Sequence, residues 1–104
     1  MDIRIPLELR VQIPQLGEAE MPDPMVWLKF TCEEAGWTWY IIEMQSLHQD
    51  AIFYGYRVGW DEELTYFNQS DLELSSAQWG LIQHAPKRCS EHLFKGVIHH
   101  LSGI

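Results

Sequence analysis

The sequence predicts an α+β fold: a four-stranded antiparallel sheet, with a fifth strand as an option, a short N-terminal helix and a C-terminal helix packed on one face. Segments rich in aromatic and β-branched residues recur between residues 25 and 67. The connections between them are short, which favours an antiparallel meander, because parallel pairing needs a long crossover. In the C-terminal segment Glu91–Leu101 the apolar residues recur at spacings of three and four, which is typical of helices.

The first half of the chain contains the first helix and four expected strands. Pro6 can open a short helix over Leu7–Ile13, and Pro14 ends it. An acidic, proline-containing loop follows at residues 15–24. We expect strands over Met25–Thr31, Trp37–Met44, Ala51–Val58 and Leu64–Phe67.

The central strand is expected over Trp37–Met44, because both of its faces are largely apolar. A period of two places one set of side chains on one face, namely Trp37, Trp39, Ile41 and Glu43. Within the next strand, Gly55 indicates a bulge or close packing by a neighbouring aromatic ring.

The last third of the chain is predicted to be mainly helical. Ser70, three residues before Glu73, forms a capping-box pattern at the start of a short helix. Leu81–His84 is either a fifth, edge strand or an extended linker. Ser90 can cap a helix over Glu91–Leu101, whose apolar residues form one stripe.

Length and charge exclude several classes of protein. The 104 residues are expected to form a single domain, 1–104, and the net charge of −8 disfavours nonspecific nucleic-acid binding. No apolar run is long enough for a membrane span, and no secretion signal is recognisable. Cys32 and Cys89 do not make a disulfide framework. We therefore expect a cytoplasmic protein without membrane contact.

The order of short motifs resembles one known family. The pattern D-P-x-V-x-x-K-F, W-T-W-Y-x-x-E, F-x-G and E-L-x-Y-F covers roughly residues 5–75. The residues of this chain that match the pattern are Asp23–Val26, Lys29-Phe30, Trp37–Tyr40, Glu43, Phe53, Gly55, Gly59, Glu63-Leu64, Tyr66-Phe67 and Ser70–Glu73. The chain departs from the pattern at Thr31, at Thr65 and from Trp79 onward. The similarity is to small uncharacterised proteins (a domain of unknown function) encoded on conjugative plasmids, phages and other mobile DNA. It implies a fold core and a mobile-DNA setting, but no activity.

The candidate binding residues are aromatic and acidic. They are Trp37, Trp39, Glu43, Tyr54, Arg57, Trp60, Asp61, Glu62 and Glu63. The aromatic residues could form a stacking platform, although large rings also build the core of a small sheet. Glu43, on a largely apolar face, is expected either to pair with Arg57 or to lie in a pocket that favours its protonated form.

Catalytic and metal-binding patterns are weak. Cys89, His92, His99 and His100 could share a face of the C-terminal helix, but their spacing differs from that of zinc-binding helices. Histidines that titrate at a solvent-exposed helix end are the simpler interpretation. We therefore predict no catalytic residue, no metal and no cofactor.

These observations leave three classes of function. The first is a non-enzymatic accessory protein of mobile DNA that binds a protein partner through an acidic, aromatic-rich surface. The second is a small-ligand pocket lined by Trp37, Trp39, Tyr54 and Glu43, and a variant of the first is an acidic DNA mimic that inhibits a host enzyme. The third is a homodimer joined along the C-terminal helix.

Overall fold

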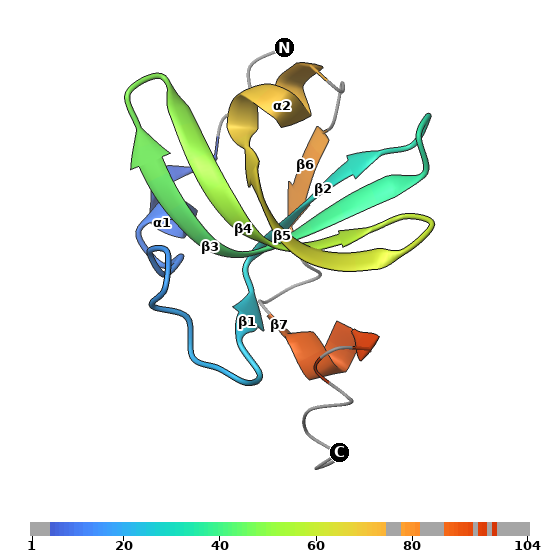
Figure 1. Cartoon of the computed structure of the whole chain (residues 1–104). Helices are drawn as coiled ribbons and strands as arrows, with labels where there is room; N and C mark the ends of the chain where they lie inside the picture. The colour runs from blue at the N-terminus through green and yellow to red at the C-terminus, as the bar shows by residue number, and fades with distance from the viewer. Residues whose placement is uncertain (1–4, 75–77, 82–86, 93, 96, 98–104) are drawn as a thin grey trace.

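The computed structural model describes residues 5–74, 78–81, 87–92, 94, 95 and 97. It contains a strongly curved sheet with short helical segments above and below it (Figure 1). The elements in chain order are α1 Leu7–Arg10, β1 Met25–Val26, β2 Leu28–Cys32, β3 Trp37–Leu47, β4 Asp50–Val58, β5 Glu62–Asn68, α2 Gln69–Leu74, β6 Gln78–Leu81, β7 Lys87–Arg88 and a 3-10 helix, η1, Cys89–His92.

The main sheet is antiparallel throughout and has the strand order β5-β4-β3-β2-β6. The predicted α+β class and the meander of β2 to β5 are therefore confirmed. A fifth strand is present, but β6 ends at Leu81, where the predicted segment begins. Residues 82–84 of that segment lie outside the described part of the chain.

A second, two-stranded sheet pairs β1 with β7. The prediction of one continuous strand over Met25–Thr31 is wrong, because the chain leaves one sheet and enters the other at Trp27. The Trp27 N–H donates to the carbonyl of Ile41 at 2.9 Å, which anchors this crossing point to β3. Val26 thus belongs to the small sheet, whereas Leu28 pairs within the large one.

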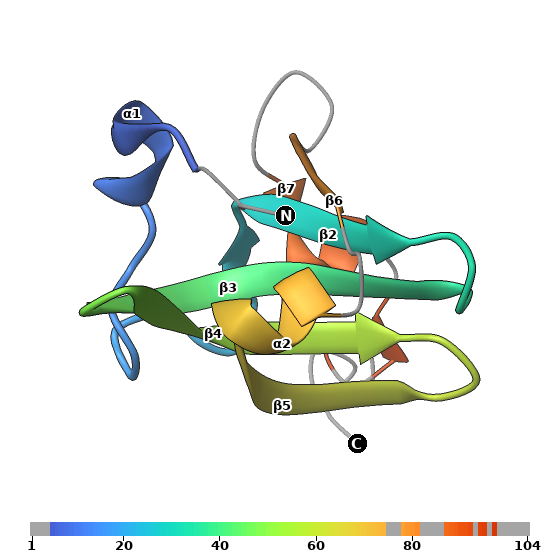
Figure 2. The ribbon, with the colours of Figure 1, turned by 90° about the horizontal axis from the view of Figure 1, so that it is seen from above.

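Two apolar clusters lie on opposite faces of the main sheet. The first core is on the face that α2 covers and contains Leu28, Phe30, Trp39, Ile41, Phe53, Phe67 and Leu72 among others. The second core is on the side of β1, β7 and η1 and contains Val26, Ile42, Tyr56, Cys89, Phe94 and Val97. Figures 1 and 2 show α2 above the sheet, with β1 and β7 on its other side.

A β-bulge in β3 separates the two halves of that strand. Ile41 pairs with Gly55, but Glu43 pairs with Tyr54, so Ile42 is an extra residue in β3. Because Gly55 and Tyr54 are adjacent and point to opposite faces, their partners Ile41 and Glu43 do so too. The prediction that Glu43 shares a face with Trp37, Trp39 and Ile41 is therefore wrong.

Gly55 lies where β4 passes closest to the bulged strand. A Cβ atom at this position would overlap the carbonyl group of Tyr40 and lie 3.2 Å from the Cα of Ile41. The neighbour of Gly55 is thus the backbone of β3. The alternative that placed an aromatic ring over this glycine is wrong.

The helices are shorter than predicted where they are described. α1 ends at Arg10, and the first helical residue of α2 is Gln69, so Ser70 lies inside the helix. The carboxylate of Asp50 instead accepts hydrogen bonds from the Ser70 N–H and hydroxyl, both at 3.1 Å. The predicted helix over Glu91–Leu101 does not begin as expected, because Cys89–His92 form a 3-10 helix and Phe94 lies in no helix. Phe94 and Val97 pack in the second core. Residues 93, 96 and 98–101 of this segment lie outside the described part of the chain. Among the helices that are described, none has the length and apolarity to cross a membrane.

Candidate functional site

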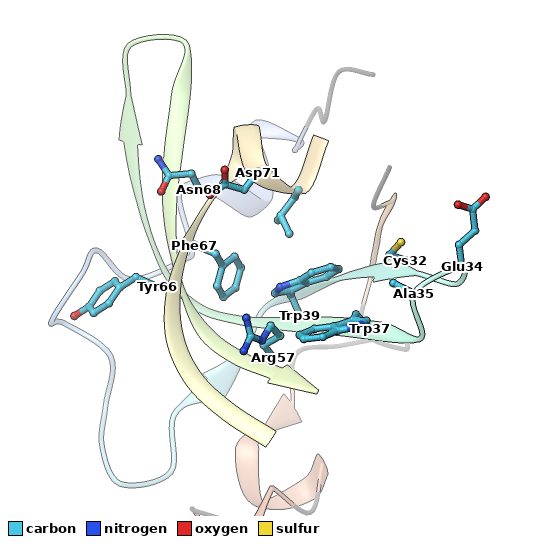
Figure 3. Close-up of a pocket in the computed structure, with 11 residues that line it drawn as sticks. Cys32, Glu34, Ala35, Trp37, Trp39, Arg57, Tyr66, Phe67, Asn68 and Asp71 are labelled. Carbon is cyan, nitrogen blue, oxygen red and sulfur yellow. The ribbon is translucent and has the colours of Figure 1, made fainter. Parts of the chain in front are cut away.

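An open pocket of about 700 Å³ lies between the first-core face of the sheet and α2. Trp37 and Trp39 project from β3, Arg57 from β4, and Phe67 from β5 (Figure 3), and Leu72 of α2 also lines the pocket. The remaining lining residues are Cys32, Glu34, Ala35, Tyr66, Asn68 and Asp71. Two of these side chains, Tyr66 and Glu34, point away from the centre of the pocket.

The two tryptophan rings and the guanidinium of Arg57 form a stacked group. The Trp37 and Trp39 centroids are 6.2 Å apart with an interplanar angle of 27°. The guanidinium carbon of Arg57 lies 4.6 Å from the centroid of the Trp37 ring, within cation–π range. Arg57 also forms an ion pair with Glu63, its partner in the β4–β5 register. The guanidinium is thus held between an indole ring and a carboxylate.

Arg57 retains hydrogen-bonding capacity in this position. Its side chain is 36% exposed, and its Nη2 donates to Glu63. Its Nε atom is buried and has no acceptor within the described part of the chain. A buried N–H without an acceptor is energetically unfavourable. A small rearrangement of the Arg57 side chain that brought this N–H to the acceptor of a ligand would therefore be favourable.

A second surface follows the outer strand β5. Three large apolar side chains are exposed here: Trp60 at 93%, Tyr66 at 62% and Leu64 at 40%. Tyr66 rests on Tyr54 with centroids 4.6 Å apart. A shallow hollow of about 730 Å³ lies beside them, lined by Tyr56, Val58, Gly59, Trp60, Asp61, Glu62, Leu64 and Lys95. We call the exposed strip of Trp60, Asp61, Glu62, Leu64 and Tyr66 the β5 margin.

The remaining candidate residues, Glu43 and Tyr54, lie on the opposite face from the pocket. Glu43 is 2% exposed, and its carboxylate accepts hydrogen bonds from the N–H groups of Gly17 at 2.9 Å and Ala19 at 2.8 Å. Its predicted pairing with Arg57 is wrong, because Arg57 pairs with Glu63. Burial, followed by the charges of Tyr66 and Glu43, raises the pKa of Tyr54.

The predicted pocket of Trp37, Trp39, Tyr54 and Glu43 is therefore not formed. The structure brings Trp37 and Trp39 together with Arg57. Phe67, Leu72 and Asp71 were not predicted as pocket residues. Leu72 and Leu74 of α2 are two positions apart and form no helical stripe, so the sequence carried no signal that this short helix would cover the pocket.

Cys89 and His92, considered above as metal ligands and not predicted to be so, pack in and against the second core. Burial raises the pKa of the Cys89 thiol to about 12, and the charges of Asp23 and Glu62 act in the same direction. The ring of His92 stacks on Phe94 with centroids 5.4 Å apart, and burial lowers its pKa. His99 and His100 lie outside the described residues.

No protein-family model, curated protein or solved structure matches this chain. The resemblance to proteins of mobile DNA therefore stays a prediction.

Proposed function

We propose that this chain is a non-enzymatic binding protein that contacts a protein partner through the β5 margin. The observation that carries the proposal is the position of β5 at the end of the strand order, with its exposed apolar side chains beside acidic ones. Its setting on mobile DNA rests on the sequence resemblance and forms part of the proposal.

The edge of β5 is suited to the addition of another strand. No backbone hydrogen bond joins its outer side to another segment of the described chain. Edge strands are usually protected by lysine, proline, bulges or covering elements. Between Leu64 and Phe67 there is neither a charge nor a proline. An extended segment of a partner can therefore pair with β5 through its main chain.

The charge of the margin indicates what that segment carries. Asp61 and Glu62 lie at the start of β5, and residues 1–86 contain four basic against fourteen acidic side chains. In a paired segment that alternates basic and apolar side chains, the apolar ones would lie with Leu64 and Tyr66, and the basic ones on the other face of β5 with Glu63. A second copy of the chain fits less well, because each copy carries a net charge of −8.

The acidic residues of this surface have structural partners rather than catalytic ones. Glu63 pairs with Arg57, and Glu62 accepts a hydrogen bond from the Lys95 N–H at 3.0 Å. Both carboxylates are thus engaged by groups of the described chain. The proposal therefore assigns binding and no chemical step.

Three synthetic octapeptides test this proposal by isothermal titration against the full chain. We expect an alternating Lys–Val peptide to bind, and its Glu–Val counterpart not to bind. A Lys–Val peptide with an N-methyl group on every backbone nitrogen keeps its charge but has no N–H to donate to a strand ladder on either edge. Equal binding of the methylated and unmethylated peptides would exclude strand addition. Light scattering that gives a dimer mass would assign the edge to a second copy instead.

A further inference from the structure

We infer that the pocket formed by Trp37, Trp39, Arg57, Phe67 and Leu72 binds a small, uncharged, planar heterocycle that has a hydrogen-bond acceptor at its edge. This site lies on the first-core side of the sheet. The inference goes beyond the proposed function, because it assigns a ligand to a pocket that the β5 margin does not need.

The shape and lining of the pocket favour a flat ring. A volume of about 700 Å³ is within the range of small-molecule sites. Trp37 is partly exposed, whereas Trp39, Phe67 and Leu72 are almost fully buried, so Trp37 supplies the accessible ring surface of the pocket. Aromatic rings gain most when they stack on such faces in an offset arrangement. The rings of Trp37 and Trp39 are 6.2 Å apart, which leaves no room for a third ring between them. The ligand therefore stacks on one side of this pair.

The charges around the pocket disfavour an anionic ligand. Among the described residues that line the pocket, Arg57 is the one basic side chain, and its charge is already offset by Glu63. Glu34 and Asp71 add two acidic side chains to the lining. A phosphate or carboxylate would therefore enter a region of net negative charge. Arg57 also lies over the Trp37 ring, which is where a ligand cation would stack. An uncharged ligand avoids both conflicts.

Arg57 determines the polar group that the ligand needs. Its guanidinium has donors beyond the one given to Glu63, and its Nε–H has no acceptor within the described chain. The guanidinium can only donate, so the matching group is an acceptor, such as the unprotonated nitrogen of a heterocycle. A charge-assisted hydrogen bond of this kind is stronger than a neutral one.

A matched series of ligands tests this inference on the unmodified protein. Indole and benzimidazole have nearly the same shape, but only benzimidazole has a ring nitrogen that accepts a hydrogen bond. Titrations would follow the tryptophan and arginine side-chain N–H signals by NMR at about pH 8, where an imidazole-type nitrogen is uncharged. We expect benzimidazole to bind about tenfold more tightly than indole and to shift the Arg57 Nε–H signal. Benzimidazole carboxylate should bind more weakly than benzimidazole.

Variants show whether the named residues are responsible. Arg57→Lys keeps the charge but removes the planar fork of donors, so the preference for benzimidazole over indole should disappear. Trp37→Leu should weaken both ligands, whereas Trp60→Ala, outside the pocket, should change neither. Equal affinities of the native protein for indole and benzimidazole, or no saturable binding of either, would overturn the inference even if Arg57→Lys does not fold. Peptide binding at the β5 margin is measured separately, so the two proposals can fail independently.

Discussion

Gly55 on β4 lies directly against the carbonyl of Tyr40 on β3, next to the bulge that Ile42 makes. The obstacle to a side chain here is backbone in the middle of the sheet, which cannot rotate away. We expect Gly55→Ala to lower the free energy of unfolding by about 3 kcal/mol or more. Urea denaturation followed by tryptophan fluorescence measures this loss.

Gly36→Ala is the matched control for that substitution. Gly36 has φ of +69°, but no atom lies within 4 Å of its Cβ position. Only the strain of the left-handed backbone is added there, at a cost of about 1 kcal/mol. Equal losses for the two variants would show that the close approach of β4 to Tyr40 is not as described.

The buried carboxylate of Glu43 connects β3 to the loop before β1. Glu43→Gln leaves one acceptor but turns an amide NH₂ towards the N–H of Gly17 or Ala19. We expect the free energy of unfolding to fall by about 2 kcal/mol, because a buried donor loses its charged acceptor. Thermal and urea unfolding both report the change. The exposed Glu20→Gln is the control and should have almost no effect; a loss as large as that of Glu43→Gln would argue against a specific role for the buried carboxylate.

Asp50 should give the fold a dependence on acid pH. The Ala51 N–H, which donates to its carboxylate at 2.8 Å, lowers the pKa of Asp50 below 3.8, and bonds from Asn68 and Ser70 act in the same direction. A lowered pKa in the folded state means that ionised Asp50 stabilises the fold. This contribution is complete above the ordinary pKa and is lost as the pH falls through the lowered one.

Asp50→Asn isolates that contribution. Urea midpoints of the native protein and the variant should differ at neutral pH and converge as the pH falls through the lowered pKa, where Asp50 becomes protonated in the folded protein. A difference that stays constant across the acid range would mean that the loss comes from altered hydrogen-bond geometry alone.

Cys89 should be inert to alkylating reagents in the folded protein. With the pKa of its thiol raised to about 12 by burial, hardly any thiolate is present near neutral pH. We expect iodoacetamide to label Cys89 far more slowly in buffer than in urea, as followed by mass spectrometry of the peptides. Similar rates in both solvents would contradict the burial of this residue in the second core.

Substitutions in the β5 margin should weaken binding of the partner while leaving the stability of the fold nearly unchanged. Trp60 is almost fully exposed, so Trp60→Ala should change the free energy of unfolding by less than about 0.5 kcal/mol. Leu64→Lys places a protective charge on the edge strand and should abolish binding of the Lys–Val peptide. Glu18→Gln, distant in sequence from the margin, serves as the comparison. Undiminished peptide binding by Leu64→Lys would place the interface elsewhere.

The alternating pattern of the central strands predicted most of the sheet, and its failures have local causes. Alternation holds from Trp37 to Ile41 and is lost at Ile42, because one extra residue reverses every side chain that follows. The sequence Ile41-Ile42-Glu43 contains no residue type that would indicate a bulge. The partner of β1 is β7, more than sixty residues away, and such distant pairing leaves no local pattern.

The candidate site was partly predictable. A three-residue loop between Val58 and Glu62 places Arg57 opposite Glu63, so this pair could have been read from the hairpin register. The position of Arg57 over Trp37 could not, because it depends on side-chain packing across β3 and β4. Trp60, in the same loop, was identified as a binding candidate, but its near-complete exposure depends on the tertiary fold.

The second core has a consequence for how the protein is made. Cys89 donates its backbone N–H to the Pro24 carbonyl at 2.8 Å, and Ser90 donates to the Asp23 carboxylate from both its N–H and its hydroxyl. These contacts join segments that leave the ribosome far apart in time. Until residues 87–97 emerge, Ile42 and Tyr56 lack the neighbours that cover them in the finished molecule. The nascent chain therefore passes through a stage in which apolar side chains on one face of the sheet are exposed and can be bound by chaperones.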